Sequence, residues 1–326
     1  MYRISVSPHI HSKDNIATIM WTVVIALIPA LLASIYFFGP RAFWLEMASV
    51  ITAVVTEAIS QKLLGRKITI YDGSAVITGL LVAFNMPPNV PFYVPIVATF
   101  FAIGIVKQLF GGLGYNIFNP ALAGRVFVMF AWLPAMTTWN QPLDPKWLAN
   151  FSLFKFNIDT VTTATPLAIV KAKGTSELIS QFGTKINLYK DLFIGKCGGC
   201  IGETSALAIL IGALFLFARR IISWHIPLSY IGTVFILTFI SGQDPIFHLL
   251  AGGLFLGAFF MATDYVTTPV TKKGMIIFGI GCGLITVLLR LKGGPPEGVS
   301  FSILFMNALS PLIDRLVKQK VFGVKK

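Results

Sequence analysis

The sequence predicts an all-α, polytopic membrane protein. Hydrophobic residues make up 55% of the 326 residues and charged residues only 12%, with a mean hydropathy of +0.78. Soluble domains usually carry about 25% charged residues, so this chain has too little polar surface for a soluble fold. The apolar residues also gather in long runs that Gly and Pro interrupt. Together these observations favour about ten transmembrane helices, some of them broken or half-length.

The spans are predicted from apolar runs near the length that crosses about 30 Å of hydrocarbon. The third, fifth and sixth runs are short, which indicates tilted, broken or partly inserted helices. The runs occupy residues 16–38, 43–64, 73–86, 92–110, 119–133, 203–217, 226–240, 245–262, 274–291 and 299–317.

Basic residues predict the orientation, because short loops rich in Lys and Arg stay in the cytoplasm. With ten alternating spans, the short loops opposite the termini hold only Arg41, Arg290 and Lys292. The side shared by both termini holds Arg3, Lys13, Lys62, Arg66, Lys67, Lys107, Arg219, Arg220, Lys272, Lys273, Arg315, Lys318, Lys320, Lys325 and Lys326. We therefore expect a protein of the inner or plasma membrane with cytoplasmic termini. Contact with anionic lipid then explains the net charge of +13 without nucleic acid.

The two halves of the chain echo each other across a long connector on the outer face. Leu81, Ala83, Phe84 and Met86 recur as Leu256, Ala258, Phe259 and Met261. Five spans per half predict two inverted repeats, whose interface commonly holds ligand and ion sites beside broken helices. Helix breakers at 85–91, 119–120 and 263–269 fit this arrangement. The expected parts are a cytoplasmic N-terminus (1–15), a first membrane repeat (16–133), an external connector (134–202), a second membrane repeat (203–317) and a basic cytoplasmic tail (318–326).

Several long motifs give the chain a family resemblance over nearly its whole length. They include YDGSA at 71–75, NIFNPALAGR at 116–125, GETSAL at 202–207, MATD at 261–264 and GGPPEGVS at 293–300. In these stretches the chain resembles the family of Rnf complex D subunits and the related B subunits of sodium-translocating NADH:quinone oxidoreductases. Its compact length favours the Rnf side of the family.

The resemblance implies a covalent flavin in the connector. In that family FMN is joined through its phosphate to a Thr hydroxyl in the pattern Asp, Gly, any residue, Thr or Ser, Gly, Ala, Thr. Residues 159–165 match this pattern at Asp159, Thr162, Ala164 and Thr165, and depart from it at Thr160 and Thr163, where Gly is preferred. Thr165 is the acceptor by position. Pro166 restricts Thr165 to extended backbone and is expected to help expose the hydroxyl. The alternative is a Thr-rich loop that makes only local side-chain to backbone bonds.

Acidic residues in apolar segments are candidates for an ion path, because each costs roughly 2.5–3.5 kcal/mol to insert. Glu46 and Glu57 share one face of the second span. Glu57, Glu203 and Asp264 are the candidates for the path, although Glu203 also suits simple helix-start stabilisation. Asp314 lies in the tenth span, and the alternative for this residue is a position near the membrane interface.

Arg125 is the basic residue of the fifth span. Its partner is either a flavin phosphate, which would make it a cofactor-binding residue, or a buried carboxylate.

Cys197 and Cys200 have the spacing of thiol oxidoreductases and zinc sites. One pair cannot complete a four-thiolate site, and no histidine obviously supplies further donors. A disulfide and an iron–sulfur role with a partner's cysteines are alternatives. We expect close packing at a helix entrance and no metal.

The resemblance implies an electron-transfer subunit of a translocase that couples ferredoxin:NAD oxidoreduction to Na⁺ or H⁺ movement and is catalytically incomplete alone. The implied partners are other membrane and peripheral subunits, an external flavin subunit, the lipid bilayer and a flavin transferase that acts outside the cytoplasm. A second, noncovalent flavin is a further expectation. The alternatives are a small-solute channel with a urea-channel-like fold and a quinone-reducing B subunit. Bound flavin distinguishes the channel from the redox proteins.

Overall fold

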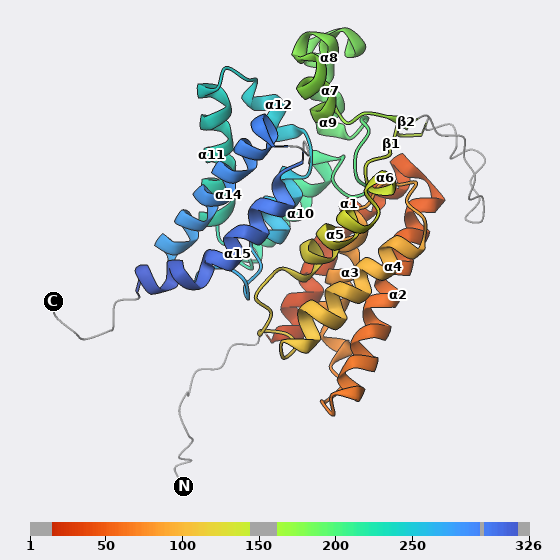
Figure 1. Ribbon diagram of the computed structural model, residues 1–326, viewed down its shortest axis with the longest axis vertical. Helices are drawn as coiled ribbons and strands as arrows, with labels where there is room; N and C mark the ends of the chain where they lie inside the picture. Colours follow the sequence, from red (N-terminus) through yellow and green to blue (C-terminus); the bar gives the residue numbers. More distant parts are fainter. Residues whose placement is uncertain (1–14, 144–161, 294–296, 319–326) are drawn as a thin grey trace, which may run out of the picture.

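A computed structural model of the chain describes residues 15–143, 162–293 and 297–318. It opens with two long helices, α1 (Ile16–Phe38) and α2 (Pro40–Leu63), shown in red and orange in Figure 1. A single residue, Gly39, joins them with φ of 76°, which glycine adopts more readily than other residues. Pro40 follows at the first helical position, where its missing N–H does no harm. The chain therefore reverses direction between α1 and α2 within one turn.

The rest of the first half is built from shorter helices. A 3-10 turn, η1 (Ile70–Asp72), precedes α3 (Ser74–Phe84). Next, α4 (Tyr93–Phe100) continues into the π-helix η2 (Phe101–Leu109), and α5 (Pro120–Ala131) follows. Gly73 is the N-cap residue of α3, and Asp72, one residue before it, accepts the N–H of Ser74 through Oδ1 at 2.8 Å. The side chain of Asn119 caps α5 through the N–H groups of Ala121 and Leu122.

The second half contains α10 (Ala206–Ala218), α11 (His225–Ile240), α14 (Lys272–Lys292) and α15 (Val299–Leu316). Between α11 and α14 the chain forms three short pieces, α12 (Pro245–Leu250), α13 (Leu254–Leu256) and the π-helix η4 (Gly257–Met261). The predicted span at 245–262 is therefore a broken helix. Its first break falls at Gly252, which has φ of 69°.

The connector covers one end of the helical bundle. It contains α6 (Leu133–Met136), strands β1 (Trp139–Asn140) and β2 (Thr162–Thr163), and helices α7 (Pro166–Lys173), α8 (Thr175–Phe182) and α9 (Lys185–Ile194). The two strands pair antiparallel, with Trp139 opposite Thr163. In Figure 1 helices α7–α9, in green, stand above α10 and beside α12. The Tyr189 hydroxyl donates to Asp244, which also lies 2.8 Å from Lys185 Nζ, so α9 is attached to the start of α12.

The prediction of a helical, multi-pass membrane protein is supported. A helix occupies each of the ten predicted segments, and α1, α2, α14 and α15 are long and apolar enough to cross a membrane. Only 22% of the apolar window of α1 is buried within the protein, which suits contact with lipid. The two-residue strand pair is the departure from an all-α fold among the described residues. The number of crossings stays a prediction.

Close contacts join the two halves. A Cβ atom at Gly212 on α10 would lie 2.0 Å from the Ala26 carbonyl oxygen on α1, so only glycine permits this approach. Deeper in the bundle, Asn119 Nδ2 donates to the Met261 carbonyl at 3.2 Å. Asn85 Nδ2 lies 3.8 Å from the Met261 sulfur. The ends of α3 and η4, which carry the repeated sequence, therefore meet where the halves pack together.

Candidate cofactor site

Thr165 lies at the start of α7 and caps that helix. Its backbone is extended, with φ of −63° and ψ of 152°, as the following proline predicts. Its hydroxyl oxygen accepts the Ala168 N–H at 3.2 Å. The side chain is only 4% exposed, so the expectation that Pro166 exposes the hydroxyl is wrong. The capping bond and the packing of Pro166 and Leu167 turn this residue inward.

The rest of the predicted attachment motif is partly described. Asp159 lies outside the described residues. Thr162 and Thr163 form β2, and Ala164 lies at the turn into α7. The strand runs close to the Cys-Gly-Gly-Cys loop, since a Cβ atom at Gly198 would lie 2.9 Å from Thr163 Oγ1. A side chain at position 198 would therefore require the Thr163 side chain to move, and it would also lie 3.2 Å from the Asn140 carbonyl oxygen of β1.

A cavity of about 470 Å³ lies beside the motif. This volume is within the range of about 300–1,000 Å³ that is usual for ligand pockets. Its lining includes Phe37, Thr163, Ala164, Phe182 and Lys196. Two aromatic rings and an ammonium group suit a flat ring system and a phosphate. A separate pocket of about 20 Å³, lined by Thr165, Glu203 and Glu297, lies on the inner side of the same loop.

Cys197 and Cys200 are buried free thiols, with no disulfide among the described cysteines. Burial first, and then the charges of Glu203 and Asp191, raise the pKa of Cys197 to about 12. Burial and Glu203 also raise the pKa of Cys200 well above its usual value. The Cys200 thiol donates to the Asn85 carbonyl at 3.4 Å. Protonated, buried thiols are poor nucleophiles, and these observations support the packing interpretation.

Arg125 is buried between the two halves and contacts a carboxylate. One Nη atom donates to Asn85 Oδ1 at 2.8 Å and to Ser300 Oγ at 3.0 Å. The other donates to Glu297 and lies 3.6 Å from Cys200 Sγ. The sequence left two possible partners for Arg125, a flavin phosphate and a buried carboxylate. In the structure its partner is the buried carboxylate. The pair links α5 of the first half to the segment that precedes α15 in the second.

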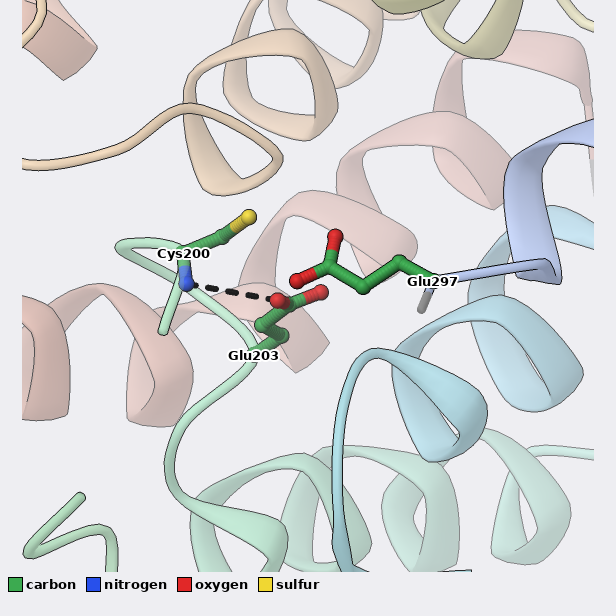
Figure 2. A group of neighbouring side chains, drawn as sticks. All are labelled: Cys200, Glu203 and Glu297. Carbon is green, nitrogen blue, oxygen red and sulfur yellow. Dashed lines mark hydrogen bonds between the residues drawn. The ribbon is translucent and has the colours of Figure 1, made fainter. Parts of the chain in front are cut away.

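Glu203 lies beside this pair, just before α10. In the described part of the chain, Cys200, Glu203 and Glu297 form the one group of three possible metal ligands, with their ligand-type atoms all within 4.8 Å of one another. Figure 2 shows the two carboxyl groups pointing toward each other, with the Cys200 N–H directed at Glu203. The structure thus brings Glu203 close to Thr165 and Arg125.

The other acids of the predicted ion path lie elsewhere. Glu57 accepts two hydrogen bonds of 2.9 Å from Lys107. The count of basic loop residues assigns Lys107 to the cytoplasmic side, but the residue is buried in η2. Glu46, on the same buried face of α2, accepts the Ser34 hydroxyl at 2.5 Å. Asp264 accepts the Thr267 hydroxyl at 3.2 Å. Asp314, in α15, accepts the Val270 N–H at 3.1 Å.

A second cavity, of about 110 Å³, lies between the halves near the start of α1. Lys107, Ser74, Asn119 and Asp264 line it among mostly apolar side chains. Polar groups thus converge at the opposite end of the bundle from α7–α9, where the broken eighth helix ends. This cavity brings Asp264 together with Lys107, the partner of Glu57.

The apolar helices, the broken segment and the connector packed over one end define a multi-pass membrane protein. The NQR2, RnfD, RnfE family profile matches residues 3–323, nearly the whole chain. The chain belongs to this family.

Individual relatives match along nearly their full lengths. The D subunit of the Na(+)-translocating ferredoxin:NAD(+) oxidoreductase complex of Acetobacterium woodii is 52% identical, covering 99% of this chain and 96% of its own. The D subunit of the proton-translocating ferredoxin:NAD(+) oxidoreductase complex of Clostridium ljungdahlii is 46% identical, covering 100% and 97%. The D subunit of an ion-translocating oxidoreductase complex of Stutzerimonas stutzeri is 40% identical, covering 95% and 93%.

Proposed function

We propose that this chain is the membrane subunit of an ion-translocating ferredoxin:NAD oxidoreductase that carries FMN as a phosphoester on Thr165. The observation that carries the proposal is the position of Thr165 at the turn between a 20 Å³ pocket and a 470 Å³ cavity. Relatives of 52% and 46% identity bear the names of such subunits. Their names differ in the ion, Na⁺ in one and the proton in the other, so the ion moved by this chain is left open.

The residues that line the 470 Å³ cavity, which Ala164 and Pro166 border on either side of Thr165, fit a tethered flavin in size and charge. Lys196 supplies a cation for the phosphate, and Phe37 and Phe182 supply apolar surface for the ring. When bound, FMN supplies one- and two-electron redox chemistry that no side chain offers. Because the Thr165 hydroxyl is buried, a flavin transferase reaches it only when the turn at Pro166 moves outward. Attachment therefore precedes the final packing of α7.

Loss of flavin on substitution of Thr165 is the expected result that tests this function. The chain and Thr165→Ala are each coexpressed with a flavin transferase and compared by in-gel flavin fluorescence after denaturing electrophoresis. The native band is expected to be lost in Thr165→Ala, because no other residue then holds the acceptor position. Thr184→Ala, which removes the same kind of capping bond at the start of α9, is the matched control and retains the band. Absence of fluorescence in all three chains would favour the solute channel with a urea-channel-like fold.

The quinone-reducing alternative has a separate readout. Purified flavinylated protein that passes electrons to a quinone would favour the quinone-reducing B subunit over the ferredoxin-linked function. A second, noncovalent flavin remains a prediction, and flavin released by denaturation without proteolysis would establish it.

The proposed orientation places Thr165 on the outer face, with ten crossings, two inverted repeats and both termini in the cytoplasm. The distribution of basic residues supports it, as does the packing of α7–α9 over one end of the bundle (Figure 1). A membrane-impermeant amine reagent applied to intact cells is expected to label the exposed Lys185 and leave Lys272 unlabelled. Labelling of Lys272 alone would reverse the orientation.

The proposed ion path uses Glu57 and Asp264 near the cavity between the halves. Lys107 neutralises Glu57 in this structure, so a cation reaches this carboxylate only when the ion pair separates. We expect Glu57→Gln to abolish ion uptake by the assembled complex and to leave electron flow less affected. Uptake measured together with NAD reduction tests this, with Glu177→Gln, an exposed residue of α8, as the control. Unchanged coupling would remove Glu57 from the path, and Asp264→Asn tests the second residue in the same way.

A further inference from the structure

Glu203 and Glu297 form a carboxyl pair whose charge is incompletely balanced. Both side chains are nearly buried, with Glu203 5% exposed and the Glu297 side chain 10% exposed. Glu203 Oε1 accepts the Cys200 N–H at 3.3 Å. Glu203 Oε2 is buried and has no partner among the described residues. In Figure 2 this carboxyl group points toward Glu297. One buried carboxyl oxygen of the pair is therefore stabilised only when a proton or a cation binds to it.

Two arginines supply the positive charge near the pair. Arg125 on α5 contacts Glu297 directly. Arg290 on α14 is buried and acts on both carboxyl groups from farther away, but its Nη atoms donate to the carbonyls of His248 and Ala251. The thiols of Cys197 and Cys200 complete the surroundings and are neutral when protonated. One guanidinium, that of Arg125, therefore contacts the pair, and it does so through Glu297.

Two like charges in one buried site favour the state in which a single proton is held between them. A buried ionised carboxylate without a donor is strongly disfavoured, and it takes up a proton instead. Burial first, and then Glu203, raise the pKa of Glu297 to about 7, although Arg125 lowers it. This direction for Glu297 agrees with the geometry of the pair, in which a buried carboxyl oxygen of Glu203 lacks a donor.

Thr165 shares a pocket with both carboxyl groups. The pocket has a volume of about 20 Å³, and a cavity of more than about 10–15 Å³ accommodates one water molecule. A negative charge placed on the Thr165 oxygen would therefore act on the pair across this small, poorly solvated pocket. Such a charge stabilises the protonated form of a neighbouring carboxyl group.

We infer that Glu203 and Glu297 share one exchangeable proton, and that a phosphoester on Thr165 strengthens the binding of this proton. The first part rests on the geometry of the pair alone. The second part rests on the proposed function, because it needs a charged group on Thr165. The site then links the charge at the flavin attachment point to proton occupancy next to the Arg125 contact that joins the two halves.

A metal ion is the competing occupant of the pair. Cys200 and the two carboxyl groups offer three donor atoms. However, the Cys200 thiol donates to Asn85, and Arg125 already contacts both Cys200 and Glu297. A divalent cation would have to displace this guanidinium and deprotonate the thiol. The contacts therefore favour the proton.

Infrared difference spectroscopy of the purified complex across neutral pH tests the first part. The spectrum is expected to contain the carbonyl stretch of a protonated carboxyl group, lost in Glu203→Gln and in Glu297→Gln. Glu177→Gln, an exposed glutamate of the same connector, leaves it in place. Glu203→Gln is the decisive variant, since Glu203 Oε2 has no partner to lose and folding is retained. A spectrum from which Glu203→Gln removes no protonated-carboxyl band would overturn the shared proton, as would a stoichiometric metal that is lost in Cys200→Ser.

The titration midpoint of the same signal tests the second part. In Thr165→Ala, confirmed to lack flavin, the midpoint is expected at lower pH than in the flavinylated complex. An unchanged midpoint would overturn the link to Thr165 while leaving the pair intact. If the native chain carried no flavin on Thr165, the proposed function and the link would both fail, and the Glu203→Gln comparison would still decide the shared proton.

Discussion

Thr165→Ala is expected to abolish ferredoxin-dependent NAD reduction by the assembled complex. Without the hydroxyl no phosphoester forms, and the electron path through this subunit loses its carrier. The loss should be complete, because the cysteines nearest the site are buried, protonated thiols that offer no redox substitute. The measurement is NAD reduction by purified complex with reduced ferredoxin, normalised to the amount of assembled complex.

Two comparisons separate this result from faulty folding. Thr165→Ser keeps a hydroxyl at the acceptor position and at the cap of α7, so it should retain flavin and part of the activity. In Thr165→Ala the loss of the capping bond costs about 1 kcal/mol, which is small for a protein of this size. The partner subunits should therefore still co-purify with it. Full electron flow in an assembled Thr165→Ala complex would contradict the account.

Arg125→Met is expected to cause a large loss of stability. It leaves Glu297 buried without its cation and removes the donors to Asn85 and Ser300. Breaking a buried ion pair from one side costs about 3–5 kcal/mol. Thermal unfolding of detergent-purified protein, followed by the loss of monodisperse protein, measures the change.

The double substitution Arg125→Met with Glu297→Met is the matched control. Replacing both partners by apolar groups removes the uncompensated charge, and such replacements are often close to neutral. The double variant should therefore unfold at a higher temperature than Arg125→Met alone. If it were less stable than either single variant, the contact between Arg125 and Glu297 would not be the source of the effect.

Much of the fold follows from local patterns in the sequence. The ten predicted segments coincide with helices because apolar runs and breakers act locally. Asp72 precedes a helix start and accepts the N–H of its first residue, although Gly73 is the N-cap residue, and Gly39–Pro40 forms a sharp turn. The break in the segment 245–262 is less clearly marked in the sequence. The signs of it are the repeated residues of this segment and the helix breakers near it. The π-helices at Phe101–Leu109 and Gly257–Met261 have no recognisable local signal.

The site is less predictable because its contacts join distant parts of the chain. Arg125 and Glu297 are 172 positions apart, so spacing gives no sign of their pairing. In the count of basic residues, Lys107 is assigned to a cytoplasmic loop. Its position within an apolar run nevertheless indicates a buried residue that needs a charged partner. The burial of Thr165 depends on how the connector packs against the loop at 197–199, which a local motif does not report.

The most direct test of the central claim is mass spectrometry of the tryptic peptide from the flavinylated chain. Cleavage after Lys155 and Lys171 releases residues 156–171, which contain Thr160, Thr162, Thr163 and Thr165. Fragmentation assigns the modified residue among these four. The account predicts one FMN phosphoester, on Thr165. An FMN group on another threonine, or an unmodified peptide from protein matured with an active flavin transferase, would contradict it.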